Sequence, residues 1–386
     1  MGDDGSGRPR YTLWELARYA LKLGTIGFGG PVALAGYMYR DLVERRRWIS
    51  EADYKEGLTL AQLMPGPLAA QLAMYLGYVH YRVRGATLVG AAFVLPSFWM
   101  VVALGWLYVR YGGLAWMQAV FYGVGAAVIG IIAISAYKLT RKNIGRDPLL
   151  WAIHVFSAAV TALTASEFVW VFLLGGVLVW LVRAPPRWLN RGGTASSLAV
   201  FALPASGVDW PQLAQVLAFF AKAGAFVFGS GLAIVPFLYG GVVTGHHWLT
   251  ERQFVDAVAV AMITPGPVVI TVGFIGYLIA GLPGSIAAAA GTFLPCYLFT
   301  IIPAPYFKKH GKRPAVAAFV DGATAAAVGT IAGAVVVLGR RSVVDLPTLL
   351  VALAAMAALV RFKKLPEPVI VAGAAALGFL LKGGPI

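Results

Sequence analysis

The sequence is poor in charged residues and in the side chains that most often carry catalysis or hold metals. Only 12% of its 386 residues are charged, against roughly 25% in ordinary soluble domains. The single cysteine, Cys296, excludes a disulfide framework and a cysteine-based zinc site. The five histidines are scattered, and GxSxG, HExxH and Walker A motifs are absent. We therefore predict that the chain is not an enzyme, uses no cofactor or metal, and does not pump with ATP on its own.

What the sequence has in abundance is apolar side chains, at 59% of the residues, with a mean hydropathy of +0.77. This composition predicts an all-α polytopic membrane protein with about 10 to 13 membrane segments. The net charge of +15 comes from short Lys/Arg clusters between apolar runs, a pattern that orients membrane helices. We therefore expect no nucleic-acid partner. The acidic-polar start lacks the features of a cleavable signal, so we expect the first segment to remain in the protein.

The sequence contains an internal repeat, since residues 12–183 recur as 212–382. At an offset of 200 residues Lys22 matches Lys222, and the PGP at 65–67 matches the PGP at 265–267; further on the offset becomes 199, and Pro96 matches Pro295. We predict a first repeat at 1–183, a polar linker at 184–211 and a second repeat at 212–386.

The first two of six apolar segments in each half are too long for one straight crossing. In the first half they cover 12–44 and 52–82, whereas about 20 residues suffice to span the bilayer. Each is interrupted, by FGGP at 28–31 and by MPGP at 64–67. Interior proline deletes a helical hydrogen bond, so the sequence predicts broken helices. Ser50 and Thr250 open the second segment of each half with the pattern of a capping box.

The loop charges favour an inverted second half. With the N-terminus inside, inversion places 19 of the counted Lys and Arg inside and 7 outside, with Arg45–Arg47 outside; a parallel second half gives 14 and 12. Inversion needs an odd number of crossings between equivalent points, and six is even. Either the short linker segment 195–205 crosses, or a long broken segment is re-entrant.

Matching interruptions in inverted repeats indicate a transport site at the repeat interface. A helix that restarts after a break exposes unpartnered N–H groups and a partial positive charge, which suits an anion. Lys22 and Lys222 could add fixed charge inside apolar stretches. Two alternatives remain: the breaks are packing kinks, and the lysines extend to the interface. The candidate binding residues are Lys22, Phe28, Gly29, Gly30, Pro31, Gln62, Pro65, Gly66, Pro67, Gln71, Lys222, Gly229, Ser230, Gly231, Pro265, Gly266 and Pro267.

Three acids also lie in apolar surroundings. Asp321 is a candidate counter-charge or proton carrier, or an interfacial residue. Glu56 and Asp256 occupy matching positions early in their helices, where an acid also favours the helix N-terminus.

The stretch FGGP…YRDLVERRRWISEADYKEGLTLAQLMPGP, from Phe28 to Pro67, resembles the chromate ion transporter family, in its long form with two similar halves. The second half departs from the motif, with FGSG at 228–231 and no triple arginine. The resemblance implies export of chromate across the bacterial inner membrane, chromate resistance, oppositely oriented halves and coupling to the membrane potential or an ion gradient.

The predicted mechanism is alternating access around an oxyanion, chromate or its look-alike sulfate, with membrane lipid around the chain and a homodimer as a compatible assembly. An oxyanion channel and a lipid-phosphate flippase are the alternative functions. A channel would show unitary conductance, and a flippase would have a lateral opening towards lipid.

Overall fold

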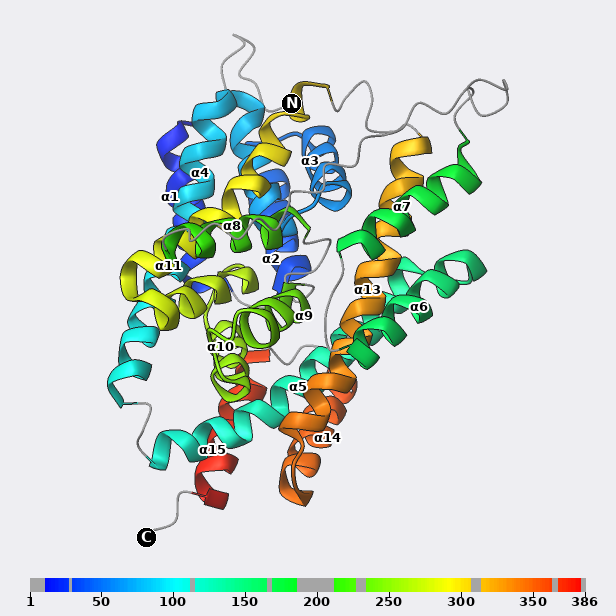
Figure 1. Ribbon diagram of the computed structural model, residues 1–386. Coiled ribbons are helices and arrows are strands. Elements are labelled where there is room, and N and C mark those ends of the chain that lie inside the picture. Colours follow the sequence, from blue (N-terminus) through cyan, green and yellow to red (C-terminus); the bar gives the residue numbers. More distant parts are fainter. Residues whose placement is uncertain are drawn as a thin grey trace.

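The computed structural model describes residues 11–27, 30–111, 115–164, 169–185, 212–226, 234–306, 314–362 and 367–382. Within these ranges the chain is helical and contains no strand (Figure 1). The helices of the first half are α1 (Leu13–Ile26), α2 (Gly30–Met38), η1 (Tyr39–Arg45), α3 (Glu51–Leu63), α4 (Leu68–Tyr111), α5 (Ala115–Asn143), α6 (Pro148–Thr164) and α7 (Val169–Arg183). Those of the second half are α8 (Gln212–Ala225), α9 (Ile234–Leu238), η3 (Tyr239–Gly245), α10 (Glu251–Ile263), η4 (Val268–Ile270), α11 (Thr271–Ile301), α13 (Pro314–Ser342), α14 (Leu346–Arg361) and α15 (Glu367–Lys382).

The predicted helix breaks are confirmed. Helix α3 ends at Leu63 and α4 begins at Leu68, with the PGP between them, and α10 and η4 flank the second PGP in the same way. The predicted caps are present as well: the Ser50 hydroxyl accepts from the N–H of Asp53, and Thr250 forms a capping box with Gln253.

Both broken segments of the first half return to the face from which they start. Tyr11, which precedes α1, stacks on Trp48, which precedes α3, with ring centroids 5.0 Å apart. The Tyr11 hydroxyl also lies 2.7 Å from Nδ1 of His80, near the end of the first part of α4. The segments 11–45 and 51–81 are therefore two re-entrant hairpins. The expectation that Arg45–Arg47 lie on the face opposite to Arg82 is wrong, because the segment 12–44 does not cross the membrane. Arg45–Arg47 and Arg82 lie on the same face, which increases the excess of basic residues on that face.

Helix α4 is itself a hairpin that reverses direction at Arg82, where φ is 51°. The two arms touch where Gly77 faces Gly85: a Cβ on Gly77 would lie 2.4 Å from the Gly85 carbonyl oxygen. Helix α11 reverses in the same way at Gly281, and Gly276 faces Gly284. The second arms, which begin after these kinks, are the long central helices of the two halves.

These two long arms run antiparallel, which confirms the inverted repeat. The Thr87 hydroxyl, near the start of the α4 arm, lies 2.6 Å from that of Tyr297, near the end of the α11 arm. Gly105, near the end of α4, packs against the ring of Tyr277, just before the α11 kink. Equivalent segments that pack in opposite directions are related by a two-fold axis across the helices, as in transporters built from inverted repeats.

The two halves also interlock through their last helices. Helix α5 of the first half packs on α14 and α15, and α13 of the second half packs on α6 and α7. A Cβ on Gly123 would lie 2.0 Å from the Ala374 carbonyl oxygen, and one on the equivalent Gly322 would lie 2.1 Å from that of Gly175. Such close backbone approach is how small residues join membrane helices.

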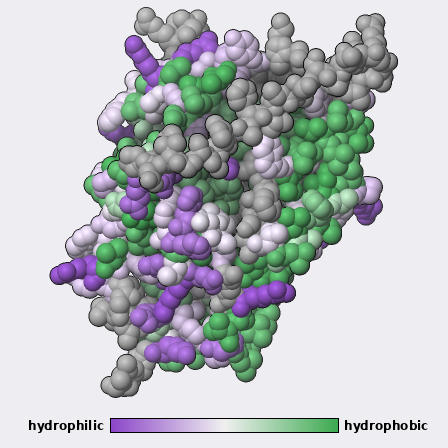
Figure 2. Space-filling model, in the orientation of Figure 1, coloured by the Kyte–Doolittle hydropathy of each residue, from purple (hydrophilic) through white to green (hydrophobic). Residues whose placement is uncertain are grey.

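Long apolar helices and an apolar surface fit a membrane protein. Four segments are long and apolar enough to cross a bilayer: Leu68–Tyr111, Gln118–Arg141, Val268–Tyr306 and Pro314–Arg340. Figure 2 shows a broad hydrophobic surface over α6, α7 and α13 at the right of the view. Large apolar side chains of α6, among them Phe156 and Leu163, are exposed. The candidate crossing at 195–205 lies outside the described residues.

Candidate functional site

The interrupted helices of the two halves meet inside the protein. The N–H of Gly266, in the second PGP, donates to the carbonyl oxygen of Gly27, where α1 ends, at 2.9 Å. The φ of Gly266 is +99°, and a Cβ there would lie 1.9 Å from Oγ of Ser97 on α4. Ser97 in turn donates to the carbonyl of Gly24 at 3.1 Å. A break of one half is thus bonded directly to a break of the other. We call this contact of Gly266 and Ser97 with Gly24 and Gly27 the junction.

The first PGP is arranged differently, around Gln71. The Gln71 side chain is fully buried, and its Nε2 donates to the carbonyl of Pro65 at 2.8 Å. Its Oε1 is buried with no hydrogen-bond partner in the described part of the chain. Thr271 at the equivalent position instead donates to Val268 at 2.8 Å, within its own turn. The first half therefore has an unpartnered acceptor oxygen at its own PGP break, in agreement with the polar residues that its sequence places there.

The two helix starts at these breaks also differ. Helix α4 begins as an α-helix, and its first intrahelical bond runs from the N–H of Gln71 to Pro67. The amides of Leu68, Ala69 and Ala70 are thus the donors that an α-helix leaves without an intrahelical partner. In the second half the N–H of Ile270 already bonds to Pro267 in a 3-10 turn. The start of α4 therefore leaves one more amide without an intrahelical partner than the 3-10 start in the second half, which favours an anion at α4.

The remaining predicted site residues lie in three kinds of place. Gly30 and Pro31 lie in the first turn of α2, and Pro65 is half-buried. Gly66, with φ +143°, and Pro67 are buried at the first PGP break, and Pro265 and Pro267 are buried at the second. Lys22 and Lys222 lie on exposed faces of α1 and α8, and Gln62 on an exposed face of α3. Phe28, Gly29, Gly229, Ser230 and Gly231 lie outside the described residues.

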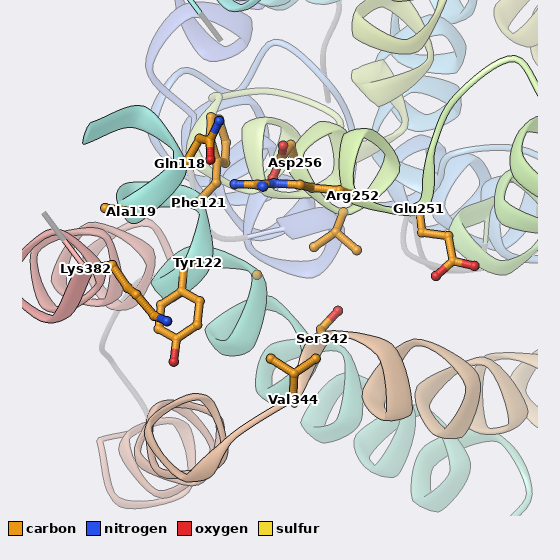
Figure 3. A pocket seen from close by; sticks show the side chains of 12 residues that line it. Gln118, Ala119, Phe121, Tyr122, Glu251, Arg252, Asp256, Ser342, Val344 and Lys382 are labelled. Atoms are coloured by element: carbon orange, nitrogen blue, oxygen red, sulfur yellow. The ribbon is translucent and has the colours of Figure 1, made fainter. Parts of the chain in front are cut away.

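A cavity of about 600 Å³ lies between α5, α10, α15 and the segment that follows α13 (Figure 3). Two cationic side chains from different helices line it, Arg252 on α10 and Lys382 at the end of α15. The Lys382 ammonium lies 5.0 Å from the ring centroid of Tyr122. The other polar lining residues are Gln118, Tyr122, Glu251, Asp256 and Ser342.

Asp256 lies at the inner side of this cavity and is only 3% exposed. Tyr108 of α4 donates to its Oδ2 at 2.7 Å, so the bond joins the two halves. The equivalent acid Glu56 accepts from Tyr75, also on α4, at 2.6 Å. The expected helix-start role does not explain why each acid has a tyrosine partner on a long helix.

On the opposite face the equivalent positions are closed by ion pairs. Arg183 ends α7 as Lys382 ends α15, and its guanidinium bonds to Asp321 of α13 at 2.9 Å and also to Asp147. The pKa of Asp147 lies below its usual value, mainly because the N–H of Leu150 donates to its carboxylate and, to a smaller extent, because of the charge of Arg183. Asp321 thus pairs with Arg183 across the boundary between the halves, and its half-exposed side chain also fits the interfacial alternative. The proton-carrier role stays a prediction.

Sequence reasoning missed the cavity because only one of its two cations has a charged match in the other half. Lys382 matches Arg183, whereas Arg252 matches Ala52, and the lining amide Gln118 matches Ala317. A search for matched residues overlooks Arg252 and Gln118. The matched acids Glu56 and Asp256 were the available signal.

Comparison with known proteins agrees with this architecture. The family model described as chromate transporter matches residues 14–180 and 214–379, one match in each half. The chromate transport protein of Cupriavidus metallidurans is 71% identical over 96% of this chain and 94% of its own length. A probable chromate transport protein of Synechococcus elongatus is 62% identical over 96% of both chains, and the chromate transport protein of Pseudomonas aeruginosa is 32% identical over 97% of this chain and 93% of its own. No solved structure matches.

The inverted halves, the long apolar helices and the helix breaks that meet between the halves define a membrane transport protein. The chain belongs to the chromate transporter family.

Proposed function

We propose that this chain is a secondary transporter that exports chromate from the cytoplasm across the bacterial inner membrane and so confers chromate resistance. Its relatives are named chromate transport proteins. Sulfate has the same shape and charge and is the expected competitor. An inside-negative potential favours outward movement of a dianion by about 2.3 kcal/mol per charge per 100 mV.

The observation that carries the proposal is the bond from Gly266 to Gly27 between the breaks of the two halves. A shift of one half against the other must change this junction, because the bond crosses the boundary. The proposed binding region is therefore the space around the breaks of the two halves, with the unpartnered amides at the start of α4 as donors. Gln71 holds the first break through its bond to Pro65, and the other predicted residues lie around both breaks.

The two faces suggest which side is open. The face with Tyr11, Trp48 and Arg45–Arg47 carries the larger share of basic residues and is the cytoplasmic face by the positive-inside rule. On that side Arg183 joins α7 to α13. The 600 Å³ cavity lies at the other end of α5. We propose that the arrangement is open to the outside, the side of release.

Uptake of labelled chromate into everted vesicles tests the proposal, because export then appears as uptake. We expect saturable uptake that sulfate inhibits and that an inside-positive potential of the everted vesicle supports. Gln71→Ala should reduce uptake, whereas Lys55→Gln, which changes an exposed pair with Glu51 on α3, should not. Vesicles without the protein that take up chromate equally fast would contradict the proposal.

The same vesicles test the two predicted lysines. Lys22→Ala and Lys222→Ala would slow uptake if the exposed faces of α1 and α8 line the anion path. Unchanged uptake in both variants would remove these lysines from the proposed site and leave the junction itself in place.

A further inference from the structure

The cavity beside α10 combines two available positive charges with one buried acid. Within the described residues neither Arg252 nor Lys382 is in an ion pair, and both side chains are exposed to the cavity. They come from α10 and α15, so the folded chain brings them to one space (Figure 3). Arg252 can give two parallel hydrogen bonds to an oxyanion and Lys382 a point charge. Gln118 adds an amide.

Asp256 opposes an anion in this space as long as it is ionised. It is buried, and its one hydrogen bond given by the structure comes from the neutral Tyr108 hydroxyl. Phe274 of α11 packs on the Tyr108 ring at 5.5 Å, and η4 has no titratable residue. The charged and titratable groups around the acid are Tyr108 of α4, Tyr122 of α5, Lys382 of α15, Arg252 and Glu251 of α10, and Asp345 before α14. Glu251 accepts from Tyr239 of η3 at 3.2 Å, and Asp345 accepts from Tyr122 at 2.5 Å and is attracted to the charge of Lys382.

Protonation resolves the conflict between the acid and the anion. Two like charges in a partly desolvated space repel strongly, and a proton on Asp256 removes that repulsion while the two cations keep their charge. By linkage, an anion in the cavity must raise the proton affinity of Asp256 by the same factor by which the proton raises anion affinity.

We infer that this cavity binds a tetrahedral dianion together with one proton, with the anion on Arg252 and Lys382 and the proton on Asp256. The inference rests on the proposed anion transport for its ligand class. It makes the cavity a second anion site, on the release side of the junction, and it gives the transporter a protein group through which anion movement depends on pH. The proton comes from solvent and stays on the carboxyl until the anion leaves.

Calorimetry of chromate binding to the purified full-length protein in nanodiscs tests this, in buffers of different ionisation enthalpy between pH 7 and 8.5. Proton uptake by chromate itself is common to all variants and cancels in the comparison. We expect the wild type to take up more protons per anion than Asp256→Asn, and its affinity to fall with rising pH by up to about tenfold per pH unit. Asp256→Asn should lack this extra dependence and bind more tightly than the wild type at pH 8.5.

Matched variants separate the site from general effects. Glu56→Gln alters the equivalent acid of the first half and should leave binding and proton uptake unchanged. Arg252→Gln should weaken binding by about tenfold or more, whereas Lys55→Gln should not. Tyr108→Phe removes the donor to the ionised carboxylate and should move the pH profile upwards.

Equal proton uptake by the wild type and Asp256→Asn, or undiminished binding by Arg252→Gln, would overturn the inference. A thermal unfolding curve for each variant identifies a loss of binding through misfolding. If the wild type transports chromate in vesicles but Asp256→Asn takes up as many protons per bound anion as the wild type, the cavity site alone is refuted. If the wild type shows no chromate flux, the proposed function is refuted.

Discussion

Replacing Gly266 with alanine tests the junction between the halves. A non-glycine residue at a φ of +99° is strained, at a cost of about 1–2 kcal/mol for a left-handed conformation. The added methyl would meet Oγ of Ser97 at 1.9 Å, and overpacking of this kind costs about 1–3 kcal/mol. We therefore expect Gly266→Ala to lower the free energy of unfolding by about 2–5 kcal/mol.

Removal of the Ser97 hydroxyl should relieve part of this cost. Ser97→Ala alone loses the bond to Gly24, about 1 kcal/mol. With Gly266→Ala it also removes the atom that the methyl would strike, so the double variant should be more stable than the sum of the two changes predicts. Gly36→Ala is the control, because a Cβ on this exposed α2 residue would meet no atom within 4 Å.

Thermal unfolding can be followed through Cys296, the single cysteine, which is buried. A thiol-reactive fluorescent probe then reports unfolding at one known position. A Gly266→Ala variant as stable as the wild type, or strictly additive effects of the two changes, would refute the packing described for the junction.

Three further outcomes follow from close helix packing and from the ion pairs of Arg183. Gly123→Ala and Gly322→Ala should both lower the unfolding temperature, because each Cβ would meet a carbonyl oxygen of the other half near 2 Å, whereas Gly373→Ala, with no atom within 4 Å, should not; equal stability of all three would contradict the interlocked fold. Arg183→Gln should cost no more than about 1 kcal/mol, since the pair with Asp147 is about a third exposed. Because the pKa of Asp147 is lowered in the folded protein, this acid stabilises the fold above its unfolded pKa and loses the effect as pH falls through its lower folded pKa. The difference in unfolding temperature between Arg183→Gln and the wild type should therefore shrink in acid. A difference that stays constant in unfolding scans from pH 7 to 3 would show that the pair does not contribute.

The breaks and the inversion could be predicted because they leave repeated signals in the sequence. Proline and glycine at matched positions mark where a helix must stop, and loop charges report orientation without any knowledge of packing. The backbone of the loop before the second segment agrees closely between the halves, even where residues differ: Arg47 and His247 share a φ near +50°.

The remaining features depend on tertiary contacts that no local pattern contains. Arg45–Arg47 were assigned to the wrong face because only the stacking of Tyr11 on Trp48 shows that the first hairpin returns. The lysines Lys22 and Lys222 are matched in sequence, but the packing of α1 and α8 decides which face they occupy. The cavity requires Arg252 and Lys382, 130 positions apart in sequence, to meet across two helices.

Counter-exchange in proteoliposomes tests the central claim most directly, namely that the two halves form a carrier that exposes one anion site alternately to each side. Liposomes that contain the purified protein and a high concentration of unlabelled chromate should take up labelled chromate faster than empty ones, with saturation. Unitary conductance in bilayer recordings, or labelled uptake that internal chromate does not accelerate, would contradict the account.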